Sequence, residues 1–145
     1  MSILQGQTTS FKVGLYKGQF NLATDTIKMA LYTGNANLNQ STTAYSSTNE
    51  VVGTGYTAGG QTMSGVSISY DATNSIAYVN WSNVIWSPAA FTARCALIYD
   101  VTASNASIAV IDFGSDKSCT NSFTVTMPAN TSSTALIRKI GRAHV

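Results

Sequence analysis

A few residues of this chain have types and spacings that could do chemistry, and a glycine-rich run comes first. Residues 53–58, GTGYTA, match the G-x-G-x-x-G/A spacing with which dinucleotide-binding proteins hold a pyrophosphate. That chemistry needs a helix that begins inside the motif, so that its first amides meet the phosphates. Gly59, Gly60 and Gly65 follow here, and each costs roughly 1 kcal/mol in a helix relative to alanine. We therefore expect no cofactor to bind.

Nucleophilic catalysis would need a serine, threonine or cysteine beside a general base. The only histidine, His144, lies in the last seven residues, which we interpret as read-through from a sequencing adapter. Without it, no Ser/His/Asp or Cys/His arrangement can form. Cys95 and Cys119 lack CxxC spacing and histidine partners, which argues against a zinc or redox site. Cys95 lies in the apolar run ARCALIY and is expected in the core, with a Cys95–Cys119 disulfide as the alternative.

Two carboxylates, Asp112 and Asp116, lie at the end of an expected strand and in the loop after it. Such a pair could act as general acid and base, or could hold calcium weakly together with Asn121. The spacing is not that of an EF-hand, and in DFGSD we favour turn residues whose carboxylates accept backbone amides. We expect neither an enzyme nor a metal site.

Four large aromatic residues could form a platform for sugar rings, namely Tyr45, Tyr56, Trp81 and Trp86. Large aromatic residues on the strands of a small β-domain contribute strongly to burial, so the tryptophans are expected in or near the core. A carbohydrate-binding or tail-associated adhesion module is kept as the alternative function.

The composition favours contact with other protein. Charged residues make up 10% of the chain, against roughly 25% in an average soluble domain. The formal charge of +2 includes Lys139 and Arg142, and without these two the basic and acidic residues balance at six each. The remaining basic residues are scattered, whereas nucleic-acid binding needs them clustered. We expect no nucleic-acid partner. The scattered residues are Lys12, Lys17, Lys28, Arg94, Lys117 and Arg138.

The last seven residues, KIGRAHV, do not continue the pattern of the strand expected over residues 134–138. Their codons could be AAG ATC GGA AGA GCA CAC GTC, which contains the start of a common sequencing adapter. We therefore hypothesise one domain over residues 1–138, followed by read-through from an assembled metagenomic fragment over residues 139–145. A natural basic tail is the alternative.

The start of the chain, MSILQGQTTSFKVGLY, lacks the basic patch and apolar run of a secretion signal. No apolar stretch approaches the length that spans a bilayer. We expect a soluble protein, made in the cytoplasm, with no membrane partner.

Local patterns predict the elements that would position these residues. Ser10 is expected to cap a short helix, and residues 27–33 alternate as a half-buried strand does. After a long segment without periodicity, β patterns recur between polar turns, and they total about seven or eight strands. The chain should be mainly β, a single-domain antiparallel β-sandwich or Greek-key barrel. The later strands are expected at 66–70, 76–81, 84–86, 94–99, 108–113, 123–127 and 134–137.

Residues 34–63, called the excursion below, have no sustained period, and a helical turn is expected only near residues 42–47. A loop of this length in a compact domain is usually functional. Its tyrosines and valines are large enough to anchor it on a core, and we expect it to be ordered and to meet a neighbouring subunit. The candidate contact residues are Tyr45, Asn49, Glu50, Val51, Val52 and Tyr56.

The order of sequence blocks carries a resemblance that extends to Arg138. The blocks are FKVGLYKG, DTIKMALYT, TAYSSTNEVVGTGYTAGG (residues 43–60), ARCALIYD, AVIDFGSDK and FTVTMPANTSSTALIR. Together they resemble a family of small virion structural proteins of tailed bacteriophages. Sequences of that family tend to end shortly after ALIRI, whereas this chain continues from Lys139.

The resemblance implies a non-enzymatic protein of the virion, made in the host bacterium, such as a capsid decoration or cement protein or another minor head protein. It also implies binding to the major capsid protein or other virion proteins, and a homo-oligomer.

Overall fold

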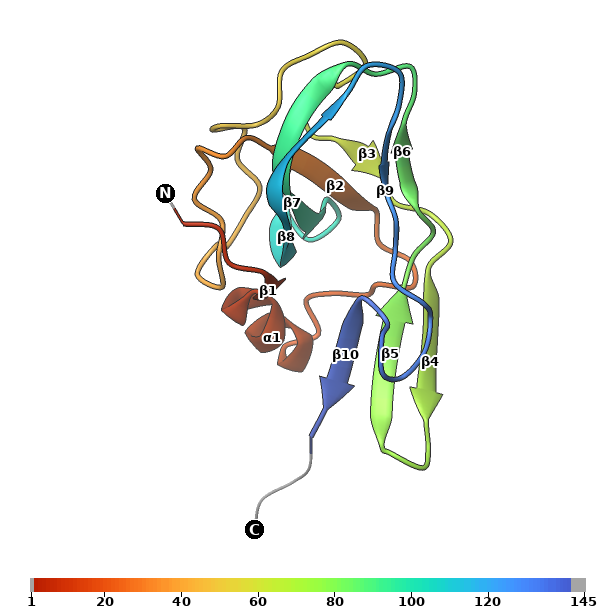
Figure 1. Cartoon of the computed structure of the whole chain (residues 1–145). Coiled ribbons are helices and arrows are strands. Elements are labelled where there is room, and N and C mark those ends of the chain that lie inside the picture. The colour runs from red at the N-terminus through yellow and green to blue at the C-terminus, as the bar shows by residue number, and fades with distance from the viewer. Residues whose placement is uncertain (1, 142–145) are drawn as a thin grey trace.

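The computed structural model describes residues 2–141, which form ten strands and one helix. Figure 1 shows them in chain order. The elements are β1 (Gly6–Gln7), α1 (Thr9–Tyr16), β2 (Ile27–Tyr32), β3 (Gln61–Thr62), β4 (Ser67–Asp71), β5 (Ile76–Asn80), β6 (Val84–Trp86), β7 (Phe91–Asp100), β8 (Ala106–Cys119), β9 (Phe123–Val125) and β10 (Ile137–Ile140).

The strands form three antiparallel sheets. The largest has the order β1-β8-β7-β2-β3, and two smaller sheets have the orders β10-β5-β4 and β6-β9. The small sheets lie along one side of the molecule and the large sheet along the other, with α1 at one end (Figure 1). The chain is therefore mainly β with a sandwich-like arrangement and one short helix, as the sequence predicted.

The main core lies between the sheets. It joins Met29 of the large sheet to Trp86 and Phe123 of β6 and β9, and to Val79 of β5. Phe11 of α1 closes this core at one end, and its ring meets the Phe20 ring edge-on with centroids 4.9 Å apart. Packing of α1 against β8 of the large sheet, with Phe11 in the core, explains why so short a helix is stable.

Helix α1 begins earlier than predicted. Thr8, not Ser10, is the N-cap, and its hydroxyl accepts a hydrogen bond from the Phe11 amide at 3.3 Å. Gly14 is buried where a β-carbon would overlap the Phe20 ring, so this glycine allows close packing despite its low helix propensity.

The centre of the large sheet, β2 and most of β7, is buried on both faces. On the face away from the main core, Tyr32, Cys95 and Leu97 form a second apolar cluster, which Leu38 and Tyr45 of the excursion cover. The strand predicted at residues 27–33 is present as β2, but it is buried on both faces instead of half-buried, because the excursion acts as a further layer over that sheet.

Some strands end at other residues than the sequence predicted, because pairing with a neighbouring strand determines where they end. β7 and β8 extend beyond the predicted ranges because they pair with each other from Phe91 opposite Cys119 to Asp100 opposite Ala106. Cys95 lies opposite Asp112, far along β7 from Cys119, and both cysteines are free. The disulfide alternative is therefore excluded.

The last strand is shifted toward the C-terminus. The prediction placed it at residues 134–137, but β10 begins at Ile137, and Lys139 and Ile140 pair with Ala77 and Ile76 of β5. These two residues continue the strand, contrary to the pattern expected of the tail. Residues 142–145 lie outside the described residues, so the read-through hypothesis stays a prediction.

Candidate functional site

The excursion is ordered by single backbone pairings to distant parts of the chain. Leu38 pairs with Ile3, Ala44 with Ala106 and Thr54 with Ala90. The helical turn expected at residues 42–47 is not formed, because Ala44 and the Tyr45 amide bond to the segment that leads into β8. The predicted order of the excursion is confirmed, and its main function within the chain is to cover the large sheet.

A buried carboxylate holds the middle of the excursion in place. Glu50 is 7% exposed, and its two oxygens accept three hydrogen bonds. The Tyr45 hydroxyl donates to Oε2 at 2.7 Å, while the Tyr56 hydroxyl and the Gly59 amide donate to Oε1 at 2.6 and 2.7 Å. Hydrogen bonds to a charged acceptor are stronger than neutral ones, so these four residues form a tight cluster, called the Glu50 cluster below.

Two glycines shape the chain around this carboxylate. Gly59 and Gly60 have φ angles of +96° and +77°, which side-chain-bearing residues rarely adopt. A β-carbon on Gly60 would also overlap the carbonyl oxygen of Met29 in β2. The turn that they allow brings the Gly59 amide to Glu50. The glycines of residues 53–60 therefore serve close packing, and no helix begins within the run, as expected.

The tyrosines of the Glu50 cluster also bond to the rest of the chain. The Tyr56 hydroxyl accepts a hydrogen bond from the Leu31 amide at 2.9 Å. Tyr45 stacks on Tyr99 with ring centroids 4.7 Å apart, and the Tyr99 hydroxyl donates to the Gly59 carbonyl at 2.7 Å. The excursion is thus fastened to both β2 and β7.

Burial and the carboxylate keep these hydroxyls protonated. Burial raises the pKa of Tyr45 and of Tyr56 above the usual range, and the hydrogen bond to Glu50 raises each further. Burial, followed by the charge of Glu50, raises the pKa of Tyr99 to about 12. At neutral pH these tyrosine hydroxyls stay protonated and donate fixed hydrogen bonds. Such fixed donors suit structural anchoring better than acid–base catalysis.

The six predicted contact residues divide into two groups. Val51 is buried in the main core, and the side chains of Glu50, Tyr45 and Tyr56 engage other residues of the same chain. Only Asn49 and Val52 are exposed, and Val52 is 96% exposed. The other four anchor the excursion within the chain, and the Asn49 side-chain amide also donates to the Asn35 carbonyl at 3.0 Å, so the predicted subunit contact stays a prediction that rests best on Val52.

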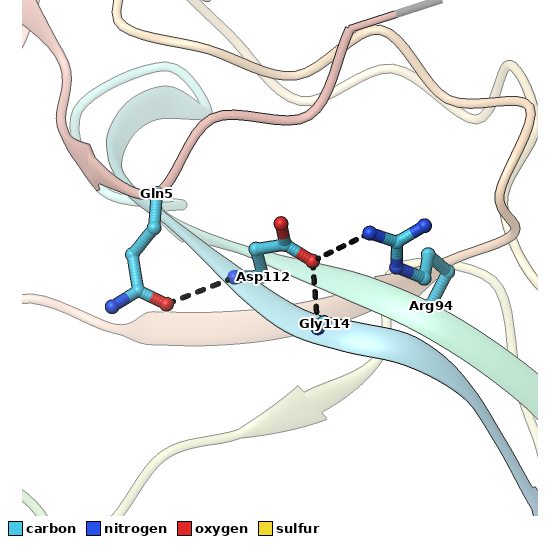
Figure 2. A network of polar contacts seen from close by, with 4 residues as sticks. All are labelled: Gln5, Arg94, Asp112 and Gly114. Atoms are coloured by element: carbon cyan, nitrogen blue, oxygen red, sulfur yellow. Dashed lines mark hydrogen bonds and ion pairs between the residues drawn. The ribbon is translucent and has the colours of Figure 1, made fainter.

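Asp112 has the structural role that the sequence favoured. Its Oδ1 accepts from the Gly114 amide at 2.8 Å and lies 3.2 Å from Arg94 Nη2, as Figure 2 shows. The Gln5 side-chain oxygen accepts from the Asp112 amide at 3.1 Å, next to the point where β1 stops pairing with β8 (Figure 2). Among residues 2–141, no three His, Cys, Asp or Glu side chains gather as a metal site would require.

The proposed sugar-binding aromatic residues do not form an exposed platform. Trp81 and Trp86 are buried, and Trp86 packs against Tyr56, Phe91 and Phe123 with centroids 6.1 to 6.4 Å apart. The expectation that the tryptophans lie in the core is confirmed.

A second buried carboxylate, Asp100, lies at the end of β7 and was not predicted from the sequence. Its Oδ1 accepts from the Ala103 amide at 3.0 Å, whereas its buried Oδ2 has no hydrogen-bond partner within residues 2–141. Burial and the hydrogen bond with Asp25 raise the pKa of Asp100 to about 6. The only available signal was an acidic residue at the end of the apolar run ARCALIYD.

Comparisons with protein-family models, curated proteins and solved structures find no match to this chain. Within residues 2–141, no helix is long and apolar enough to cross a membrane. The arrangement of the described residues is one of rigid packing, with a few apolar side chains left facing outward.

Proposed function

We propose that this chain is a non-enzymatic structural protein of a tailed-bacteriophage virion, a capsid decoration or cement protein or another minor head protein. The observation that carries the proposal is Val52, a fully exposed valine on a segment that the Glu50 cluster holds rigid. The resemblance of the sequence blocks and the sparse charge support the same assignment.

A rigid attachment point suits binding to a repeating shell. An apolar side chain held in one position loses little conformational entropy when a partner covers it. Each contact can be weak, because many identical contacts on one shell act together when the subunits are linked. Val52 and Asn49 would then bury against the major capsid protein or another virion protein.

A point substitution tests this contact better than a deletion. Deletion of residues 49–60 would remove Glu50, Val51 and Tyr56 and would disrupt the core. The sharper variant is Val52→Asp, which places a charge in the proposed contact without touching a buried residue. We expect it to fold normally and to lose cosedimentation with shells assembled from a major capsid protein encoded beside this gene, if the gene neighbourhood contains one.

Ile85→Asp is the matched control, because Ile85 is an exposed apolar residue of β6 whose neighbours Val84 and Trp86 are buried on the opposite face. It should cosediment as the wild type does. Normal shell binding by Val52→Asp would refute the contact assigned to Val52, and a source contig without virion genes would refute the proposed function itself.

A further inference from the structure

The outer edge of β4 is a sheet edge that lacks the usual features that prevent pairing with another chain. In the order β10-β5-β4, β4 is the last strand, so within residues 2–141 one of its edges pairs with nothing. Residues 65–70, GVSISY, contain no charged residue and no proline, the usual devices that keep an exposed edge from pairing with another chain. The backbone of this edge is therefore open to a further strand.

The apolar side chains of β4 lie on the same face of the sheet as Val79 of the main core, because Ile68 is paired with Val79, but they extend beyond that core and stay exposed. Ile68 and Tyr70 are 56% and 75% exposed, and Val66, just before the strand, is exposed as well. Ser67 and Asp71 lie on the other face, where they bond to Asn130 and Ser132 of the segment before β10. The apolar row of β4 is thus left uncovered.

An apolar groove continues this row toward α1. The groove has a volume of about 260 Å³ and lies between α1 and the β4–β5–β10 sheet. Phe11, Leu15 and Phe20 form one wall, and Ile68 and Val79 belong to the other. The exposed row and the groove make one continuous apolar surface at the edge of the domain.

We propose that this surface pairs with the same surface of a second copy, with the two β4 strands antiparallel across a two-fold axis at Ile68. Antiparallel pairing of a strand with itself is self-complementary, which is what a closed dimer requires. In this register Ile68 lies opposite its counterpart, Val66 lies opposite Tyr70, and Ser67 lies opposite Ser69. Asp71 faces Gly65, so no like charges meet.

The residues along the β4 edge fit a second copy of the same strand better than a strand of different sequence. Each exposed apolar residue of the row meets an apolar residue, and each serine meets a serine, so one short uncharged sequence supplies both sides. A contact of about five residues per strand buries well below the ~1,600 Å² of a standard interface, and the dimer should be weak. Such a dimer does not depend on the proposed virion function, although an array on a shell would strengthen it.

Two charge variants of the full chain test the register. Ile68→Lys and Ile68→Glu each place like charges opposite one another across the axis, which destabilises paired strands. Sedimentation velocity should show concentration-dependent dimers of the wild type, and each variant alone should bind itself at least about tenfold more weakly, a change of about 1.4 kcal/mol. An equimolar mixture should form a heterodimer, because lysine then faces glutamate.

Ile85→Lys on β6 is the control, and it should dimerise as the wild type does. Circular dichroism and thermal unfolding check that each variant is folded, which the exposure of Ile68 favours. A wild type that stays monomeric up to millimolar concentration would overturn the proposal. So would variants that dimerise normally, or a mixture that stays monomeric, since position 68 would then not face itself.

Discussion

Glu50 and Asp100 are both buried carboxylates, but their surroundings are opposite. Glu50 accepts hydrogen bonds from two tyrosine hydroxyls and one amide, so both of its oxygens are occupied by donors. Asp100 accepts an amide on Oδ1, while its Oδ2 has no hydrogen-bond partner within residues 2–141, and the Asp25 carboxyl raises its pKa further. The same chemical group is thus satisfied in one place and short of donors in the other.

In these two sites the hydrogen-bond donors around the carboxylate, more than its burial, determine whether the ionised group stabilises the fold. Taking a carboxylate out of water is costly unless hydrogen bonds replace the lost hydration. Around Glu50 the donors do so, and the acid fastens the excursion to the large sheet. Around Asp100 they do not, and the result is a pKa raised to about 6 by burial and by Asp25. One site stabilises the fold, whereas the other weakens it when ionised.

Removal of the Glu50 carboxylate should have the largest effect. Glu50→Ala leaves the Glu50 hydrogen bonds of Tyr45, Tyr56 and Gly59 unmade, and each buried unsatisfied donor costs about 1–3 kcal/mol. We expect the free energy of unfolding in urea at pH 7 to fall by about 4 kcal/mol. Glu50→Gln, which keeps the shape and an acceptor oxygen, should lose about half as much. A loss below about 1 kcal/mol for Glu50→Ala would show that the cluster does not hold the excursion.

Alkaline pH should have the next largest effect. In the folded protein the pKa of Tyr45, Tyr56 and Tyr99 is raised above the value near 10 that applies when the chain is unfolded. Stability is therefore complete below pH 10 and is lost as the pH rises beyond it, because only the unfolded chain releases these protons. We expect the free energy of unfolding to fall by about 3 kcal/mol between pH 9 and pH 11.

Ultraviolet absorbance of tyrosinate provides the readout for this change. The clustered tyrosines should ionise together with unfolding, and Tyr16 is an exposed tyrosine outside the cluster. Tyr16→Phe is accordingly the control, and it should leave the alkaline transition where it is. Ionisation of all tyrosines well before unfolding would contradict the protective role given to the Glu50 cluster.

Sequence patterns predicted the parts of the fold that local chemistry decides. The β4–β5 hairpin follows from alternation around the polar turn at residues 72–75, and α1 from a short amphipathic run, although its cap was misplaced by two residues. The length of β8 and the shift of β10 were not predictable. They depend on pairing with β7 and β5, and no local pattern encodes such pairing.

The sequence predicted which segment forms the candidate site, but not that most of its side chains point inward. The donors to Glu50 come from within nine residues of it, so the segment held the information, yet only the folded chain shows that its side chains turn inward. Val52 and Val51 are neighbours of the same type with opposite exposure, which no composition rule separates. Asp25 and Asp100 meet only because β2 pairs with β7.

Asp100→Asn should have the smallest effect on the free energy of unfolding, and it should raise that free energy where the other changes lower it. The asparagine oxygen still accepts the Ala103 amide, and its new amide group can donate to Asp25, which supplies the missing donor. Because the pKa of Asp100 is raised to about 6 in the folded protein, the stability that the wild type has below pH 4 is lost as the pH rises through 6. The variant should therefore be more stable than the wild type by about 1–2 kcal/mol at pH 7.5.

Urea unfolding across pH 4 to 7.5 measures this difference. The wild type should lose stability over that window through Asp100, and Asp100→Asn should remove that loss. Asp116→Asn, at an exposed aspartate of β8, is the matched control and should keep the wild-type profile. If Asp100→Asn is less stable than the wild type at pH 7.5, the Asp100 carboxylate is stabilised much as Glu50 is, and the contrast between the two sites fails.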